Sequence, residues 1–292
     1  MKLRSLLFVP ADSERKLAKG LSSPADVLIL DLEDAVAQAR KVGARHTAAQ
    51  FIGANAAQLE SRQTRLFVRI NPLDTDLAMG DLAAVVVPGL AGIMLPKTNS
   101  AADVVHLAHC LDALEARAGI AAGSVLILPV ATETAQAMLN MQSFNAPLPR
   151  LAGVTWGAED LSSAVGAVAN RDEDGEYSPL YVLAASLCLC AAAATGVPPI
   201  DTVHTDFRDA AGLANACRAS RRRGFRGRMA IHPDQVAIIN DAYSPSTAEL
   251  AHAQAIVDAF AANPDAGALN LDGAMIDKPH LTQALRTLGQ ER

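Results

Sequence analysis

The sequence predicts an α/β protein built as a (β/α)₈ barrel, also called a TIM barrel, with a C-terminal helical extension. Short runs rich in Val, Ile and Leu recur along the chain, and each is followed by polar residues and a helical pattern, which is typical of repeated β-α units. We count eight such runs, and eight parallel strands favour a closed barrel over an open sheet. None of the runs is followed by a glycine-rich phosphate loop, which argues against a dinucleotide-binding or P-loop fold.

The eight predicted strands are spread over the first 231 residues. They cover residues 6–9, 27–30, 66–70, 92–95, 125–130, 151–156, 200–203 and 228–231. Helices are predicted between them, among others at residues 12–20, 101–118, 134–142, 180–195 and 207–223. Pro245 and Ser246 mark a break after the eighth unit. We therefore predict a catalytic barrel at residues 1–244 and an extension at residues 245–292, which we expect to pack on a neighbouring subunit.

The composition is that of an ordered globular protein. Half of the 292 residues are hydrophobic, which supplies a sizeable core, and the net charge of −6 argues against a protein that coats nucleic acid or an anionic membrane. The apolar run at residues 6–9 is too short for a signal peptide, and residues 180–196 are too short for a comfortable membrane span. The four cysteines lack the paired spacing of a zinc site. We expect a cytoplasmic protein with reduced cysteines and no nucleic-acid or membrane partner.

Polar residues follow most of the predicted strands. In a barrel the C-terminal strand ends converge on one mouth, so these residues are the candidates for function. The clusters are DLED at residues 31–34, RINP at 69–72, PK at 96–97, ET at 133–134, GAED at 157–160 and IHP at 231–233.

Two carboxylates from neighbouring strand ends, Glu133 and Asp160, are predicted to face each other across the mouth. Octahedral Mg²⁺ typically accepts two carboxylates together with water and substrate oxygens. The pair therefore predicts a magnesium site that could also take Mn²⁺. Taken singly, each acid could instead cap the helix that follows it.

Arg69 is the candidate for binding a substrate carboxylate, because its planar guanidinium matches the two oxygens of a carboxylate better than a lysine does. Asp31, Glu33 and Asp34 are predicted to hold that guanidinium in place from behind. Two alternatives remain open from the residues alone: Arg69 as a purely structural ion-pair partner, and Lys97 as a solvated surface lysine.

An arginine-rich run, RRRGFRGR at residues 221–228, precedes the eighth strand. It could be a solvated helix end, a contact for an anionic ligand such as the phosphates of coenzyme A, or an RNA contact. The acidic chain and its few aromatic residues weaken the RNA interpretation. His232, just before Pro233, is interpreted as a hydrogen-bonded turn histidine and not as a base.

A series of motifs runs through nearly the whole chain: RSLLFVP (residues 4–10), DLEDAV (31–36), VRIN (68–71), LPK (95–97), ET (133–134), GAEDL (157–161), GF leading to IHPDQ (224–235), and GAMIDKP (273–279). In this order and spacing, they resemble the citrate lyase beta subunit and malyl-CoA lyase group within the HpcH/HpaI aldolase superfamily. Two departures stand out. Ala11 replaces the glycine that is usual after the first strand's proline, and Arg228 replaces a lysine.

The resemblance implies an oligomeric TIM barrel, a homotrimer or homohexamer, with Mg²⁺ held at Glu133 and Asp160. It implies that Arg69 binds the carboxylate of the keto-acid half, that backbone N–H groups of residues 157–160 assist, and that Asp277 reaches a neighbouring subunit's site. The catalytic candidates are thus Arg69 and Asp277. The substrate-binding candidates are Arg69, Lys97, Gly157, Ala158 and Glu159.

The function predicted on this basis is Mg²⁺-dependent carbon-carbon cleavage of a carboxylated 3-hydroxyacyl thioester of coenzyme A to an acyl-CoA and a 2-keto acid. Citryl-, malyl- and citramalyl-type substrates all stay open, as does an acyl carrier protein in place of free coenzyme A. One alternative is a metal-dependent aldolase that acts on a free hydroxy-keto acid. A second is a barrel that binds a partner without catalysis.

Overall fold

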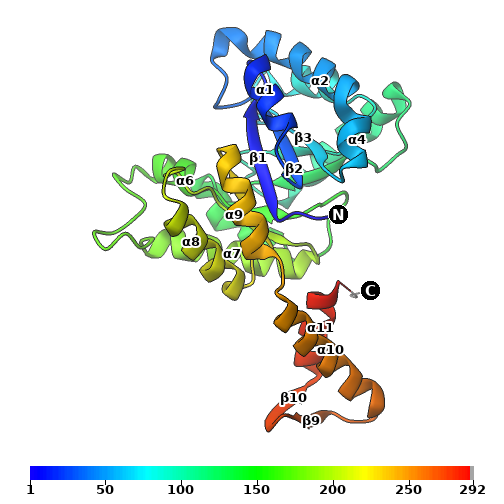
Figure 1. The fold of residues 1–292 in the computed structure, drawn as a ribbon. Coiled ribbons are helices and arrows are strands. Elements are labelled where there is room, and N and C mark those ends of the chain that lie inside the picture. Colours follow the sequence, from blue (N-terminus) through cyan, green and yellow to red (C-terminus); the bar gives the residue numbers. More distant parts are fainter. Residues whose placement is uncertain (290–292) are drawn as a thin grey trace. The chain divides into compact units, whose positions relative to one another are not determined.

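The computed structural model describes residues 1–289, and the chain divides into two compact units, Met1–Tyr243 and Ser244–Arg292. The first unit consists of eight parallel strands in the order β5-β4-β3-β2-β1-β8-β7-β6, with helices outside them (Figure 1). Parallel bridges from Ile127 to Leu151 and from Val130 to Thr155 join β5 to β6. These bridges close the sheet into a barrel, so the predicted fold class is confirmed.

The strands agree with the predicted runs to within a few residues, except at the sixth. β6 is only Val154–Thr155, because just two of its residues pair with β7. The residues before it make isolated backbone hydrogen bonds to β5 and no continuous ladder. The other strands are β1 Ser5–Pro10, β2 Val27–Asp31, β3 Arg65–Arg69, β4 Gly92–Leu95, β5 Leu126–Pro129, β7 Pro199–Asp201 and β8 Gly227–Ala230.

The helix ends follow local capping. α4 begins at Ala101, after a capping box of Ser100 and Asp103, and ends at Ala118, before Gly119 in the left-handed conformation. The helix predicted at residues 207–223 begins only at Ala210, because the Asp209 side chain accepts a hydrogen bond from a backbone N–H in its first turn. The other barrel helices are α1 Glu14–Leu21, α2 Lys41–Ser61, α3 Ala78–Val85, α5 Ala135–Asn140, α6 Ala158–Val165, α7 Pro179–Thr195, α8 Ala210–Arg223 and α9 Pro233–Tyr243, with 3₁₀ turns at Gln38–Arg40 and Met141–Ser143.

None of the helices within residues 1–289 is long and apolar enough to cross a membrane. Even α7, which is rich in alanine, is a barrel helix whose Tyr181, Ala184 and Cys188 are buried in the core.

Alternate residues of each strand point into the barrel or out toward the helices. In β1, Leu7 and Val9 belong to the large core between strands and helices, whereas Leu6 belongs to a smaller core inside the barrel together with Ile29 and Phe67. The inward-facing residues nearest the C-terminal strand ends are therefore the ones that line the mouth.

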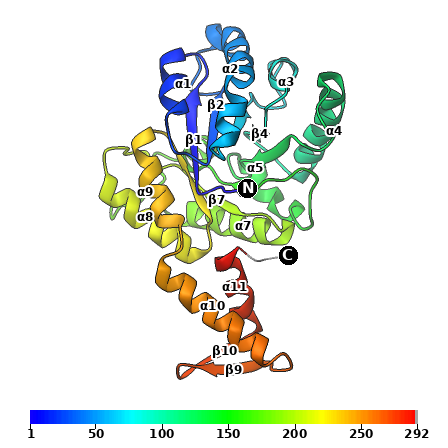
Figure 2. The ribbon, with the colours of Figure 1, turned by 45° about the vertical axis from the view of Figure 1, so that its right-hand side comes forward.

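The second unit pairs two helices with a β-hairpin (Figure 2). α10 is Thr247–Ala262, the hairpin strands are β9 Ala268–Leu271 and β10 Ala274–Asp277, and α11 is Lys278–Leu288. Ile256, Phe260, Ile276 and Ala284 form its own small core. The extension was predicted to be helical, and the hairpin is an addition to that prediction. It turns at Asp272 and Gly273, both with positive φ.

Candidate active site

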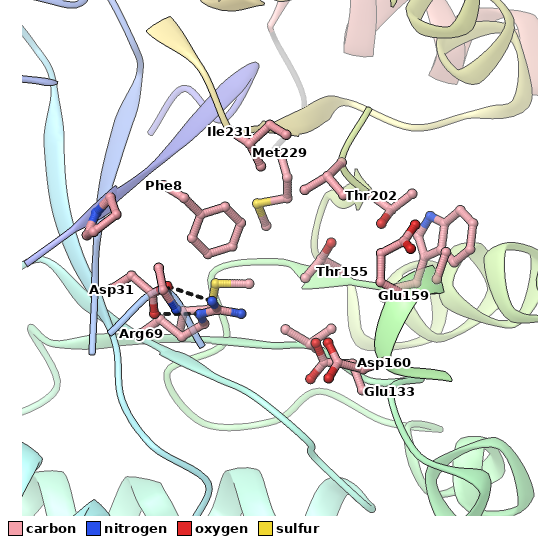
Figure 3. A pocket seen from close by; sticks show the side chains of 18 residues that line it. Phe8, Asp31, Arg69, Glu133, Thr155, Glu159, Asp160, Thr202, Met229 and Ile231 are labelled. Carbon is pink, nitrogen blue, oxygen red and sulfur yellow. Dashed lines mark hydrogen bonds and ion pairs between the residues drawn. The ribbon is translucent and has the colours of Figure 1, made fainter. Parts of the chain in front are cut away.

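A cavity of about 280 Å³ opens among the C-terminal ends of the strands. Figure 3 shows Arg69 with Asp31 on one side of it and Glu133 with Asp160 on another, below Phe8 and Met229. Most of the residues predicted for the site line this one cavity: Asp31, Arg69, Glu133, Gly157, Ala158, Glu159 and Asp160.

Glu133 and Asp160 lie side by side at the cavity wall (Figure 3). Burial of Glu133, and next the negative charge of Asp160, raise the pKa of the Glu133 carboxyl to about 8. Glu133 is not a helix cap, because Thr134 caps α5 by accepting a hydrogen bond from the N–H of Ala137 at 3.0 Å. Asp160 does lie in the first turn of α6, where a carboxylate is favoured by the helix dipole.

Gly157 lets the backbone pass close to Glu133. A Cβ atom at this position would lie 2.6 Å from Cγ of Glu133, so any side chain here would displace the acid. Gly157 is also the N-cap residue of α6, and no side chain caps that helix. The first N–H groups of α6 are therefore free of a side-chain acceptor beside the cavity, where they can donate to an anion.

Arg69 is both ion-paired and turned to the cavity. Its Nε donates to Oδ1 of Asp31 at 2.8 Å, its Nη2 donates to Oδ2 at 2.7 Å, and its Nη1 lies 3.0 Å from Oε2 of Glu33. Burial opposes the charged form, but Asp31 and Glu33 outweigh it and raise the pKa of Arg69 above its ordinary value. A guanidinium has five N–H groups, so Arg69 keeps donors for another carboxylate. Asp34, at 3.8 Å, is the most exposed of the three acids.

Lys97 lies among acids instead of facing the cavity. Its Nζ is 2.5 Å from Oε1 of Glu33, 3.2 Å from Oδ1 of Asp160 and 3.6 Å from Oδ2 of Asp34. Burial raises the pKa of Glu33 to about 7, against the opposing pull of Arg69 and Lys97. Lys97 is not among the described residues that line the cavity, and its ion pairs show that it is not simply a solvated surface lysine.

The site holds more carboxyl groups than cations. Two cations, Arg69 and Lys97, lie among five carboxyl groups, those of Asp31, Glu33, Asp34, Glu133 and Asp160. No group of three or more His, Cys, Asp or Glu side chains that could hold a metal occurs in the described part of the chain. A metal site built on Glu133 and Asp160 would have two protein ligands and would leave the other coordination positions to water and substrate oxygens, as is typical of Mg²⁺.

A second cavity, of about 490 Å³, shares Phe8, Pro10 and Ile231 with the first. Its wall includes three basic residues of α1, and within the described residues 1–289 none of the three forms an ion pair: Arg15, Lys16 and Lys19. Sequence reasoning missed this cluster, because exposed lysines on a helix look alike until the fold brings them beside a cavity.

Sequence reasoning also missed a buried network beneath Trp156, a residue of the cavity wall. The indole Nε1 donates to Oδ1 of Asp201 at 2.8 Å, and the other oxygen of Asp201 pairs with Arg228. Tyr177 packs edge-on against Trp156, with ring centroids 5.3 Å apart. The network fixes the strand end that leads into Gly157.

The arginine run does not meet this cavity. Arg228 is buried against Asp201, and Arg221, Arg222 and Arg223 lie at the C-terminus of α8, which precedes β8 and so lies at the opposite end of the barrel from the mouth. The placement argues against its contact with a ligand at the mouth. His232 is a turn histidine as interpreted: its Nδ1 accepts from the N–H of Asp234 at 3.3 Å, and its ring stacks on Phe207.

Asp277 lies in the C-terminal unit, where it caps α11. Its Oδ1 is 2.5 Å from Nδ1 of His280, and the hydrogen bond with His280 lowers the pKa of the carboxyl. The side chain remains partly exposed.

A sequence model described as HpcH/HpaI aldolase/citrate lyase matches residues 4–233. The chain belongs to this family. It is 35% identical over 289 residues to a (3S)-malyl-CoA thioesterase of Cereibacter sphaeroides strain KD131, covering 98% of this chain and 94% of that protein. It is also 35% identical over 287 residues to a citrate lyase subunit beta-like protein of Mycobacterium tuberculosis, covering 97% and 95%.

Solved structures of family members carry ligands. The protein CitE of M. tuberculosis, in complex with magnesium, acetoacetate and coenzyme A, matches with a TM-score of 0.77 and 34% identity, covering 99% of this chain and 98% of that one. A citrate lyase beta subunit from M. tuberculosis, complexed with oxaloacetate and magnesium, matches with a TM-score of 0.68 and 34% identity over 84% of this chain and 98% of that one. The family membership predicted from the motifs is confirmed.

Proposed function

We propose that this chain is a magnesium-dependent carbon-carbon lyase that cleaves a carboxylated 3-hydroxyacyl-CoA thioester, of the citryl-, malyl- or citramalyl-CoA type, to an acyl-CoA and a 2-keto acid. The observation that carries the proposal is the pair of facing carboxylates, Glu133 and Asp160, in one cavity with Arg69. The magnesium in solved family members supports the same choice of ion.

Glu133 and Asp160 fit as the protein ligands of that ion. Asp160 lies close enough for its charge to raise the pKa of Glu133, and the site holds more carboxyl groups than cations. When bound, Mg²⁺ acts as a Lewis acid on oxygens of the substrate, which lowers the pKa of the hydroxyl. Mn²⁺ has the same preference for carboxylate and water oxygens and would substitute for it.

Arg69 orients the substrate and stabilises charge. With Asp31 fixing one edge of the guanidinium, its remaining N–H groups bind the carboxylate of the keto-acid half and hold the bond to be broken in one orientation. The N–H groups at the start of α6, from Ala158 and Glu159, add donors for oxygens that gain negative charge during cleavage.

The reaction removes the hydroxyl proton and breaks the C2–C3 bond, whose electrons pass to the thioester half as an enolate. The group that accepts the hydroxyl proton returns it to the enolate carbon, and the product leaves as the acyl-CoA. We assign both proton transfers to Asp277 of a neighbouring subunit, in a homotrimer or homohexamer in which the C-terminal extension packs on that neighbour. Its side chain is partly exposed on its own subunit, which leaves the carboxylate open to a neighbour's site.

The second cavity supports a thioester of coenzyme A over a free hydroxy-keto acid. It adjoins the first through Phe8, Pro10 and Ile231, and it offers the cations of Arg15, Lys16 and Lys19. A small free acid would fill only the first cavity, whereas the phosphates of a long coenzyme fit a neighbouring basic one. The same chemistry would accept the phosphopantetheine arm of an acyl carrier protein.

The test is keto-acid release from citryl-, malyl- and citramalyl-CoA, with Mg²⁺ and with EDTA, alongside detection of free thiol. Keto-acid and acyl-CoA produced only with Mg²⁺ support the lyase. Free thiol without keto-acid would show hydrolysis of the thioester, which the name of one relative describes for that relative, and would contradict the proposal. Activity on the free acids alone would favour the aldolase alternative.

The role of Asp277 predicts complementation between inactive chains. Asp277→Ala and Glu133→Gln chains, each about a thousandfold less active alone, should regain activity when they are unfolded together, refolded and assembled, because mixed oligomers contain some sites with both residues intact. Mixed oligomers that stay inactive, while oligomers refolded from the parent chain recover, would contradict transfer between subunits.

A further inference from the structure

Lys97, which is not among the described residues that line the cavity, contacts both proposed metal ligands. It has a φ of 47°, in the left-handed region that residues with a side chain seldom adopt. In this conformation its backbone N–H donates to Oε2 of Glu133 at 2.6 Å, and its Nζ lies 3.2 Å from Oδ1 of Asp160. Strained backbone of this kind persists where the surroundings hold it in place.

The ammonium of Lys97 has a second carboxylate to pair with, besides that of Asp160. Oε1 of Glu33 is the closer partner, at 2.5 Å against 3.2 Å for Asp160. The ammonium can therefore give up Asp160 and remain neutralised by Glu33.

We propose that Lys97 is a positioning residue that serves as an internal counter-ion for the metal site, and not a substrate ligand. It holds Asp160 in place while no metal is bound, and it competes with a divalent ion for the same carboxylate, which weakens metal binding. This inference rests on the proposed function, because it takes Glu133 and Asp160 as the metal ligands. Two cations that share one carboxylate oxygen repel each other, so removing the ammonium should tighten binding of Mg²⁺.

The test is a calorimetric titration of the metal-free, full-length protein with Mg²⁺, without substrate. Lys97→Met and Lys97→Gly both remove the ammonium and keep the backbone N–H that binds Glu133. Each should lower the Kd for Mg²⁺ by about tenfold, the scale of one unit charge at a partly exposed site. Lys97→Gly should also melt at a higher temperature than Lys97→Met, because glycine adopts a positive φ without strain.

Lys2→Met is the matched control, since Lys2 precedes β1 and so lies at the opposite end of the barrel, and it should leave the Kd unchanged. The difference between Lys97→Met and the parent should shrink at high salt, which a merely structural role would not produce. If the parent binds Mg²⁺ and both Lys97 variants bind it equally or more weakly, the counter-ion role is overturned. If the parent itself binds no Mg²⁺, the proposed function fails instead.

Discussion

The two sides of the cavity differ in how their charged side chains are paired. On the first side, Arg69 and Asp31 make two hydrogen bonds, and Glu33 adds a further charge partner, so the ions are matched by protein groups. On the second side, Glu133 is buried, accepts a hydrogen bond from the backbone N–H of Lys97 and faces the negative charge of Asp160. The first side is complete in the protein alone, whereas the second has two carboxyl groups beside one shared ammonium, and Glu133 keeps a proton there while no metal is bound.

The sharpest way to test this contrast is to remove one acid from the second side. Asp160→Asn should abolish the rise in melting temperature on adding Mg²⁺ and lower metal-dependent turnover by about a thousandfold, or ~4 kcal/mol, while the barrel stays folded. Glu159→Gln, which changes the neighbouring acid of the same helix, is the control and should keep the thermal response to Mg²⁺. Full activity in Asp160→Asn would remove Asp160 from the metal site.

On the first side, the expected loss is in stability. Asp31→Asn should lower the free energy of unfolding by about 3 kcal/mol, because it leaves the buried guanidinium of Arg69 with a weaker partner. Chemical denaturation measures the change, and Asp34→Asn, at the more exposed acid, should cost less than about 1 kcal/mol. Equal losses in the two variants would contradict the idea that this side is completed by its buried ion pair.

A smaller effect is expected for Arg69→Lys. The charge is kept but the planar pair of donors is lost, so kcat/KM should fall by about thirtyfold, or ~2 kcal/mol, with the Kd for Mg²⁺ nearly unchanged. Steady-state kinetics and a metal titration on the same preparation separate the two quantities. Kinetics equal to the parent's would exclude Arg69 as the group that binds the substrate carboxylate.

The smallest effect is a pH dependence of the metal-free protein. The pKa of Glu133 is about 8 in the folded chain and near 4.5 when unfolded, so the folded form keeps a proton that the unfolded form loses between these values. Stability therefore falls as pH rises through this window, by about 1 kcal/mol more between pH 7 and pH 8 than in Glu133→Gln, which lacks the titrating group. Identical pH profiles by thermal denaturation would show that Glu133 is ionised throughout.

Much of the fold follows from local patterns in the chain. The runs rich in Val, Ile and Leu predict the strands because each is buried on both faces, and α4 was predicted at its observed ends because its capping box and Gly119 lie in the sequence. β6 was predicted too long, since the two residue pairs that define it depend on how β7 lies beside it. The hairpin of the extension was missed because β9 and β10 are short and largely exposed.

The candidate site was predictable where one rule sufficed. All parallel strands of a barrel end at the same mouth, so the sequence by itself determined that Arg69, Glu133 and Asp160 would meet. The tertiary structure alone decided what surrounds them, because the partners come from distant segments: Lys97 against Glu33 and Asp160, Asp201 under Trp156, and the basic residues of α1 beside a second cavity. Periodicity and motifs report which strand end a residue occupies, but not the side-chain directions and distances that set its charge partners.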